Sequence, residues 1–236
     1  MPGPLIVIDG PAGAGKSTVA RTVAEAIGAA LLDTGAIYRG LAYLARERGV
    51  DWDDEPGLAA IAATLRIEFQ PAAEPGAPQR VLISSDEPGA ETLDVTSSIR
   101  TPDISDGASR VSRHQAVRAA LLDIQRAIAA TSVESGHGCV AEGRDMGTVV
   151  FPDARHKFFL TASAAARAGR RHKELVARGQ APSRTQVEVE MARRDQRDSS
   201  RATAPLQQAK DAALIDSSEL DVAAVVSRIL AAVDPA

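Results

Sequence analysis

The sequence predicts an α/β protein in which a parallel sheet is covered by helices on both sides. Short, uninterrupted apolar runs recur along the chain, and such runs are typical of strands buried on both faces. Amphipathic helical segments follow or separate these runs. Because strands that alternate with helices form parallel βαβ units, the two observations together favour a helix-covered parallel sheet.

The predicted elements begin with an apolar strand, Leu5–Asp9, which passes directly into a glycine-rich turn. The next elements are a helix over 17–27, a strand over 30–33 and a helix over 36–48. Further buried strands are expected over 139–141, 158–160 and 213–215, and further helices over 116–130, 164–178 and 220–233.

Residues 66–95 interrupt this alternation. Strand-like runs over 66–69 and 79–84 are separated by prolines and by the turn sequence Glu-Pro-Gly at 74–76, and a third short strand is expected over 91–95. This pattern predicts a small antiparallel insertion. Trp52, which precedes it, is interpreted as a packing residue at a junction between a helix and a loop.

A second unusual segment, 167–201, holds nine arginines and few large apolar residues. Ser183 and Gln186 have the spacing of a capping box, so we expect a helix to begin there. Sparse apolar content suits a lid that closes over substrates. A pair of surface helices joined by salt bridges would show the same charge density, and composition does not separate the two interpretations.

Composition and charge exclude several classes of protein. The chain has 236 residues and a net charge of −4, and it contains a single cysteine, Cys139, interpreted as a small buried residue. A disulfide framework and a multi-cysteine metal site are therefore excluded. We expect no nucleic-acid partner, because such proteins usually carry a basic excess, and no membrane partner, because no apolar stretch approaches the ~18–20 residues that a span needs. The N-terminus lacks the cationic start of a signal peptide, which predicts a cytoplasmic protein.

The most informative motif follows the first strand. It matches the phosphate-binding loop pattern, in which glycines let backbone N–H groups point at a polyphosphate and the following helix contributes its positive end. Lys16 would bridge the outer phosphates, and the Ser17 hydroxyl would ligate Mg²⁺. The residues expected to bind the triphosphate are Gly10, Pro11, Ala12, Gly13, Ala14, Gly15, Lys16, Ser17 and Thr18.

Two kinds of triphosphate-binding protein carry such a loop: switch GTPases and small-molecule kinases. A switch GTPase needs an Asn-Lys-x-Asp motif, and the sequence contains no asparagine. The Asp-Glu-Pro-Gly at 86–89 has switch-like spacing, but the same tetrapeptide recurs at 54–57, so we interpret it as a turn. A kinase is favoured, because phosphoryl transfer between anionic partners depends on positioning and on neutralising charge, and 23 of the 27 basic residues are arginine. Coding bias would produce the same arginine excess.

Three further stretches carry a family resemblance: Asp33-Thr-Gly-Ala-Ile-Tyr-Arg39, Gly143-Arg-Asp-Met-Gly-Thr-Val-Val-Phe-Pro-Asp153 and Arg194-Asp-x-x-Arg197-Asp-x-x-Arg201. With the phosphate loop, they closely resemble the bacterial cytidylate kinase family, which phosphorylates CMP and dCMP. The resemblance implies the fold of a nucleoside-monophosphate kinase of the P-loop type. Its parts would be a five-stranded parallel sheet flanked by helices, a small antiparallel β insertion and an arginine-rich helical lid. The chain would be one P-loop kinase domain over 1–236, with a monophosphate-binding region at about 34–112, its β insertion near 66–95 and a lid at about 167–203.

The resemblance also implies roles for individual residues. Arg144 would hold the acceptor phosphate and Asp145 the base, Arg194 and Asp198 would contact the sugar, and Arg201 would reach toward base and phosphate. The remaining substrate-binding residues would be Thr34, Tyr38, Arg39, Ser109 and Arg118. The expected catalytic residues are Lys16, Arg144, Arg167, Arg171 and Arg201.

The chemistry of cytosine supports these roles. Its N4 amino group donates where uracil has an O4 acceptor, so a carboxylate such as Asp145 would select cytosine. Losing one such buried match costs on the order of 1–3 kcal/mol. Two alternatives stay open: Asp145 could cap a helix or orient an arginine, and Asp198 could simply pair with Arg194 or Arg201.

The resulting prediction is an ATP- and Mg²⁺-dependent kinase of pyrimidine metabolism that converts CMP and dCMP to CDP and dCDP and acts as a monomer. Asp9 and Asp145 are candidates for supporting the metal. A kinase for another acceptor, such as UMP or AMP, and a regulator that binds nucleotide without catalysis are the alternatives.

Overall fold

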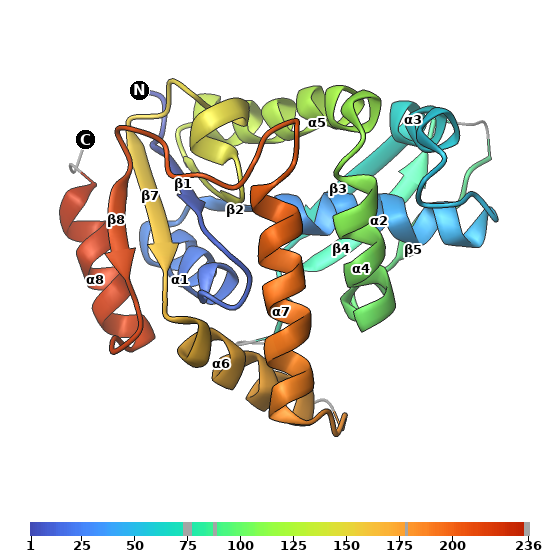
Figure 1. Ribbon diagram of the computed structural model, residues 1–236. Coiled ribbons are helices and arrows are strands. Elements are labelled where there is room, and N and C mark those ends of the chain that lie inside the picture. The colour runs from blue at the N-terminus through green and yellow to red at the C-terminus, as the bar shows by residue number, and fades with distance from the viewer. Residues whose placement is uncertain (73–76, 87–88, 178, 234–236) are drawn as a thin grey trace. The chain divides into compact units, whose positions relative to one another are not determined.

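The computed structural model describes residues 1–72, 77–86, 89–177 and 179–233 (Figure 1). These residues form two compact units. The first contains Met1–Leu32 together with the described part of Ile128–Ala236, and the second contains Asp33–Ala127.

The first unit is built on a five-stranded sheet with the order β2-β6-β1-β7-β8. Its strands are β1 (Leu5–Asp9), β2 (Ala30–Asp33), β6 (Cys139–Gly143), β7 (His156–Thr161) and β8 (Ala213–Asp216). In register, Leu5 of β1 lies opposite Cys139 of β6, and Ile6 lies opposite His156 of β7. The predicted five-stranded parallel sheet is therefore confirmed.

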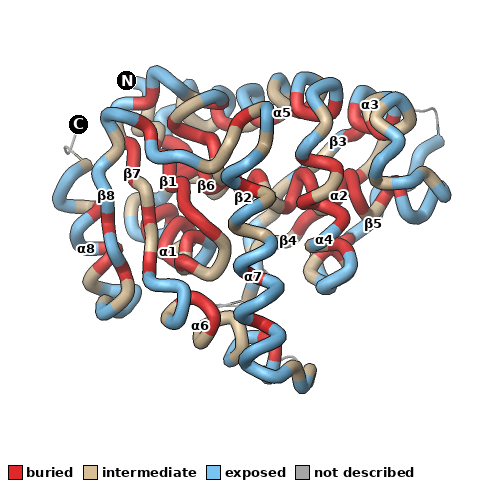
Figure 2. Tube along the Cα trace, viewed as in Figure 1, coloured by how far each residue is buried: buried red, intermediate tan, exposed pale blue. Residues whose placement is uncertain are grey.

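The core of this unit lies where the central strands meet α1 (Lys16–Ile27) and α8 (Val222–Ala232). β6 is buried along its whole length, as is Cys139, which confirms the interpretation of that cysteine (Figure 2). The prediction that residues 213–215 form a buried strand is wrong in one respect. The strand exists, but only Ile215, on the face that joins the core with α8, is buried, whereas Leu214, which points to the opposite face, is 58% exposed.

The second unit combines helices with a small antiparallel sheet. Its helices are α2 (Thr34–Glu47), α3 (Glu55–Thr64) and α4 (Pro102–Val111), with a 3₁₀ turn at Ser98–Arg100, and α5 (Gln115–Glu134) starts here. The predicted insertion is confirmed as β3 (Leu65–Gln70), β4 (Arg80–Ser85) and β5 (Leu93–Asp94), although β5 is shorter than expected. The predicted turn at 74–76 and part of the one at 86–89 lie outside the described residues.

Helices α3 and α4 were not predicted, and both begin with a side-chain cap followed by proline. At α3, Asp54 Oδ1 accepts a hydrogen bond from the N–H of Gly57 at 3.2 Å. The tetrapeptide at 54–57 is thus a helix start. Proline is favoured in the first helical turn, where its missing N–H costs nothing.

The arginine-rich segment forms two packed helices, α6 (Ala164–Ala177) and α7 (Arg184–Ser199). The predicted capping box is present, because Ser183 Oγ accepts from the N–H of Gln186 at 3.2 Å and Gln186 Oε1 accepts from the N–H of Ser183 at 2.8 Å. A small apolar cluster holds the pair together and also contacts Ala12 in the glycine-rich turn; its members are Ala168, Leu175, Val187 and Met191.

Candidate active site

The loop between β1 and α1 has a backbone that only glycine adopts easily. Gly13 and Gly15 have φ values of 72° and 95°, and Gly10 has φ of 148°. A Cβ atom on Gly10 would lie 1.9 Å from the carbonyl oxygen of Leu160 in β7. The glycines of the predicted motif are therefore required by backbone conformation and by close packing against the sheet.

Lys16 begins α1 and is buried beside this loop. Its Nζ donates to the carbonyl oxygen of Pro11 at 2.9 Å. Burial and the nearby guanidinium of Arg144 lower the pKa of Lys16 to about 7, with a smaller lowering from Arg194, while Glu142 and Asp198 oppose the shift. The ammonium of Lys16 is thus desolvated and lies near other cations, and an anion bound there would favour its charged form.

Two arginines of α6 hold the carbonyl oxygens of the loop. Arg167 Nη1 donates to Ala12 O at 3.1 Å and pairs with Asp195 at 2.6 Å. Arg170 Nη1 donates to Ala14 O at 3.4 Å, and the Ser217 hydroxyl donates to the same oxygen at 3.2 Å. The carbonyl oxygens of Ala12 and Ala14 are therefore held from α6 and from the segment after β8.

Arg171, which the sequence predicts to be catalytic, has a different neighbour. Its Nη1 pairs with Glu174 Oε2 at 2.8 Å along α6. Its role stays a prediction. Arg170 was not singled out from the sequence, although a signal was available: it lies three residues after Arg167, a spacing that places two side chains on one face of a helix.

Asp198 near the end of α7 lies between two arginines. Arg144 Nε donates to its Oδ2 at 3.0 Å, and Arg201 Nη2 pairs with its Oδ1 at 3.1 Å. Burial raises the pKa of Asp198, but the guanidiniums of Arg144, Arg201 and Arg194 lower it by more, so the carboxyl is held ionised. The pairing with Arg201 was one of the alternatives for Asp198, and the pairing with Arg144 was not foreseen.

The turn after β6 is anchored by Asp9 at the end of β1. Its two carboxylate oxygens accept hydrogen bonds from the N–H groups of Met146 and Gly147, at 2.9 and 2.8 Å. Burial raises the pKa of Asp9 to about 6, against the lowering effect of these two bonds. The bonds hold the first turn of a π-helix, Met146–Val150, which immediately follows Asp145.

Asp145 is the residue that precedes this π-helical turn, and it is 3% exposed. Its side chain makes no capping hydrogen bond to the turn. The alternative in which Asp145 serves as a helix cap is therefore wrong, because Asp9 already accepts the N–H groups that a cap would satisfy.

In the second unit, α2 carries three predicted substrate-binding residues: Thr34, Tyr38 and Arg39. Arg39 Nη2 pairs with Asp33 Oδ2 at 2.8 Å, and the other oxygen of Asp33 caps α2 by accepting from the N–H of Ala36 at 2.9 Å. Thr34 and Tyr38 are buried.

The other two predicted residues of this unit lie on α4 and α5. The guanidinium of Arg118 lies over the ring of Tyr38, 5.6 Å from its centre. Arg118 Nη1 donates to Ser112 O at 3.4 Å, and the Ser112 hydroxyl donates to Ser109 O at 3.1 Å. The Ser109 hydroxyl is buried and has no hydrogen-bond partner within the described ranges of the chain. Tyr38, Ser109 and Arg118 are thus linked by successive contacts.

Comparison with known proteins covers nearly the whole chain. Residues 6–235 match the model of the cytidylate kinase family. The chain belongs to the cytidylate kinase family. It is 48% identical over 227 residues to the cytidylate kinase of Pseudomonas syringae pv. tomato, covering 96% of this chain and 93% of the relative. The cytidylate kinase of Chromobacterium violaceum is 44% identical over the same length, covering 94% of that relative.

Membership of the cytidylate kinase family makes this protein a nucleoside-monophosphate kinase, a phosphotransferase with nucleotide substrates. The resemblance found in its motifs is thereby confirmed. Among the helices that the structure describes, none combines the length and apolar character required to cross a bilayer.

The side chains of this cytidylate kinase family member fit Mg²⁺ only in part. The Ser17 hydroxyl is exposed at the start of α1, where the metal of a bound triphosphate would lie. Within the described ranges, no cluster of three or more His, Cys, Asp or Glu side chains is arranged to hold a metal. Among the described side chains, Ser17 is thus the residue placed to contact a magnesium ion carried by a bound triphosphate.

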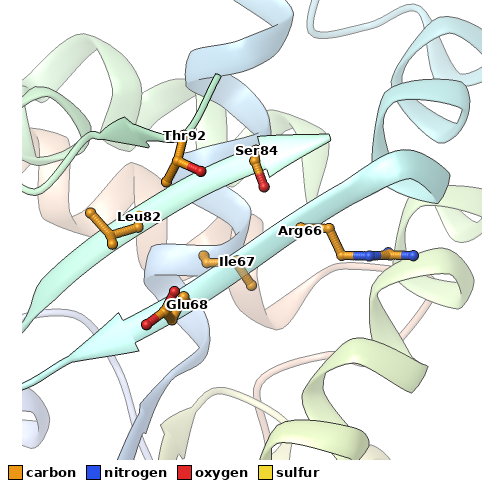
Figure 3. Close-up of a pocket in the computed structure, with 6 residues that line it drawn as sticks. All are labelled: Arg66, Ile67, Glu68, Leu82, Ser84 and Thr92. Carbon is orange, nitrogen blue, oxygen red and sulfur yellow. The ribbon is translucent and has the colours of Figure 1, made fainter. Parts of the chain in front are cut away.

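A small pocket opens on the antiparallel sheet, lined by Arg66, Ile67, Glu68, Leu82, Ser84 and Thr92 (Figure 3). Arg66 is already paired with Asp86. None of the predicted substrate-binding residues is among those that line this pocket.

Proposed function

We propose that this kinase transfers the γ-phosphoryl group of ATP to CMP or dCMP, giving ADP and CDP or dCDP in pyrimidine nucleotide metabolism. The observation that carries the proposal is the buried Lys16 beside the glycine loop, whose pKa is lowered to about 7 first by burial and then by the nearby guanidiniums of Arg144 and Arg194, against the opposing effect of Glu142 and Asp198. A bound polyanion would add negative charge where the carboxylates compensate only in part. A triphosphate donor and a phosphate acceptor supply that charge.

On the donor side, the loop of residues 10–18 would cradle the triphosphate through its backbone N–H groups, Pro11 excepted, and Lys16 would contact the outer phosphates. Ser17 would help to hold Mg²⁺, which supplies charge neutralisation at the phosphates when it is bound. Arg167 would act from its position against Ala12, with Arg144 and Arg201 offsetting the charge that develops during transfer. Arg171, one turn after Arg167 on α6, would also offset this charge.

On the acceptor side, Thr34, Arg39 and Arg144 would bind the phosphate of CMP. Tyr38, Ser109, Arg118 and Asp145 would surround the base, and Arg194, Asp198 and Arg201 would contact the sugar and its phosphate. The buried Ser109 hydroxyl supports this assignment, since it is available to hydrogen-bond a ligand. The buried Asp145 carboxyl supports selection of cytosine through its amino group.

The first test is ADP release measured in parallel with CMP, dCMP, UMP and AMP, with and without EDTA. We expect turnover with the cytidine nucleotides that EDTA abolishes. Faster turnover of UMP or AMP would refute the choice of acceptor, and ATP binding without any transfer would indicate a regulator instead.

The matched variant is Asp145→Asn, which preserves size but presents an amide in place of the carboxylate. We expect kcat/KM for CMP to fall about 10- to 100-fold relative to UMP, because one buried polar match is worth about 1–3 kcal/mol. Equal loss with both substrates would show that Asp145 does not read the base.

We further propose that the enzyme works as a monomer in the cytoplasm, without nucleic-acid or membrane partners. Light scattering during size-exclusion chromatography tests the oligomeric state, and a mass near twice 24.6 kDa would contradict it.

A further inference from the structure

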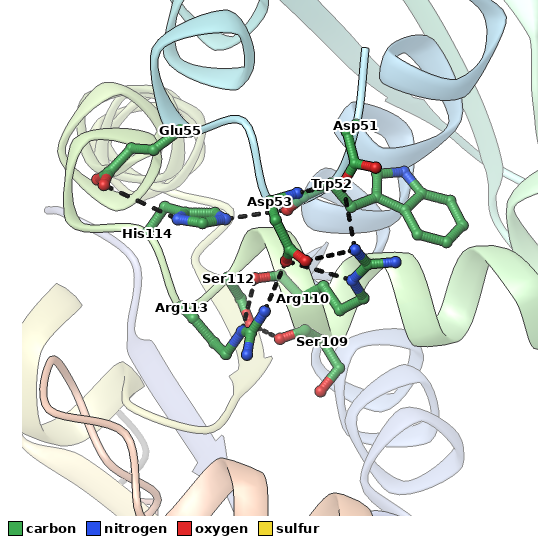
Figure 4. Close-up of polar contacts among 9 residues, drawn as sticks. All are labelled: Asp51, Trp52, Asp53, Glu55, Ser109, Arg110, Ser112, Arg113 and His114. Atoms are coloured by element: carbon green, nitrogen blue, oxygen red, sulfur yellow. Dashed lines mark hydrogen bonds and ion pairs between the residues drawn. The ribbon is translucent and has the colours of Figure 1, made fainter. Parts of the chain in front are cut away.

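Trp52 lies in the connection between α2 and α3, and Figure 4 shows it beside Arg110 and His114. Hydrogen bonds join it to α2 and to the segment that follows α4. Its Nε1 donates to Ala42 O in α2 at 2.9 Å. Its own carbonyl oxygen accepts from His114 Nε2, directly after α4, at 2.9 Å. One residue therefore ties α2 to the junction of α4 and α5.

The indole ring also packs directly against α4. A Cβ atom on Gly107 would lie 2.6 Å from Cε2 and Cζ2 of Trp52, so the ring lies against α4 at Gly107 with no space for a methyl group. Arg110, one turn further along α4, places its guanidinium 5.5 Å from the centre of the same ring. The Trp52 ring thus sets how closely the segment between α2 and α3 approaches α4.

The elements that Trp52 joins carry the acceptor residues of the second unit. Tyr38 lies on α2, one turn before Ala42, and Ser109 lies two residues after Gly107 on α4. Arg118 on α5 already contacts Tyr38. A change in the spacing of these helices would move the Ser109 hydroxyl relative to the Tyr38 ring, and misplacement of about 1 Å can cost about 100-fold in activity.

We propose that Trp52 is a positioning residue that fixes the spacing of α2 and α4 and thereby sets the affinity for the nucleoside monophosphate. The inference rests on the proposed function, because it takes Tyr38 and Ser109 to contact the acceptor. The ion pairs around Trp52 contribute less to the spacing of the helices. Asp53 forms ion pairs with Arg110 and Arg113, but its side chain is 55% exposed, and exposed pairs usually stabilise a protein by less than about 1 kcal/mol.

Two single variants perturb the contact from opposite sides. Trp52→Leu removes the ring and its hydrogen bond, and Gly107→Ala inserts a methyl group where the ring now lies. For each we expect KM for CMP to rise about tenfold, while KM for ATP and kcat stay within about twofold. Asp53→Asn is the matched control, and we expect all three parameters to stay within about twofold of wild type.

The double variant Trp52→Leu/Gly107→Ala separates positioning from general damage, because the added methyl group occupies part of the space that the ring leaves. We expect its KM for CMP to rise by less than the product of the two single effects. Additive effects, or equal increases in KM for CMP and ATP, would overturn the proposal. Should Trp52→Leu fail to fold, Gly107→Ala and Trp52→Phe, which keeps a ring without Nε1, give the same comparison.

The wild-type acceptor panel is run first, so that the two hypotheses fail separately. If a monophosphate other than CMP is the preferred acceptor, the proposed function fails and the KM comparison is made with that acceptor. A selective rise in its KM would still support the positioning role of Trp52, and an unchanged KM would refute it.

Discussion

Each unit of this kinase places one aspartate between two arginines, and the two clusters differ mainly in their exposure to water. In the first unit, Asp198 pairs with Arg144 and Arg201, and the carboxylate is 6% exposed. In the second, Asp53 pairs with Arg110 and Arg113, at 2.6 and 2.7 Å, and it is 55% exposed (Figure 4). The two clusters therefore contain the same types of side chain, but the aspartate of one is buried and that of the other is exposed to water.

Burial changes what such a cluster does. Water screens the charges around Asp53, so each of its pairs contributes little and the cluster holds α4 to its neighbouring connection only weakly. Around Asp198 the charges are desolvated, and removing one partner leaves the others buried without compensation. The catalytic role proposed for Arg144 and Arg201 would benefit from this arrangement, because both guanidiniums are held in place by Asp198 and would need little reorganisation when a phosphate binds.

The largest expected difference is in turnover. Arg201→Ala should lower kcat by about 100- to 1,000-fold with the fold intact, because a guanidinium that offsets transition-state charge is worth that much or more. Arg113→Ala should change kcat by less than about twofold. Steady-state kinetics with CMP measure kcat for both variants, and circular dichroism checks that they are folded. Near-wild-type turnover of Arg201→Ala would show that Arg201 has no part in the mechanism.

A smaller difference is expected in stability. Asp198→Ala should lower the free energy of unfolding by about 3 kcal/mol, because it leaves Arg144 and Arg201 buried without their shared carboxylate. Asp53→Ala should lower it by less than about 1 kcal/mol. Urea denaturation measures the free energy of unfolding of both variants. Equal losses of stability would mean that burial does not distinguish the two clusters.

The two clusters should also differ in how much stability they lose at low pH. The pKa of Asp198 is held below its ordinary value, since the three guanidiniums outweigh the opposing effect of burial. The stability that this provides is fully present above about pH 4, where the unfolded carboxyl is ionised, and is lost as pH falls through the lower folded pKa. The pKa of Asp53 is also lowered, chiefly by its hydrogen bond to Arg110, but water screens that exposed pair, so it contributes less stability. Asp198→Asn should therefore flatten the loss of stability below pH 4 more than Asp53→Asn does. Thermal melts from pH 2.5 to 7 would show it, and parallel curves would contradict it.

The smallest expected effect is that of salt. Raising NaCl to about 0.5 M shortens the screening length to about 4 Å, which weakens exposed pairs more than buried ones. The stability difference between wild type and Asp53→Asn should shrink toward zero, whereas that for Asp198→Asn should persist. Unfolding at both salt concentrations tests this, and a salt-sensitive Asp198 would place it in contact with solvent.

Local patterns predicted the elements whose partners are near in sequence. The phosphate loop is specified by its glycines, since Gly13 and Gly15 need positive φ wherever the chain goes. The capping box at Ser183 closes within four residues. Helices α3 and α4 were missed because their caps lie among prolines and glycines that also suit turns, and only packing of Leu58 and Ile104 in the interior decides for helix.

The sequence by itself determined the parallel α/β architecture, the triphosphate loop and the family, because these depend on patterns within short segments. Tertiary structure alone decided which distant groups meet: Asp9 with the N–H groups of Met146 and Gly147, Arg170 with Ala14, and Trp52 with α4. It also decided which of the two chemically similar arginine–aspartate clusters is buried away from solvent. Solvent exposure depends on every element packed around a side chain, so no local pattern contains it.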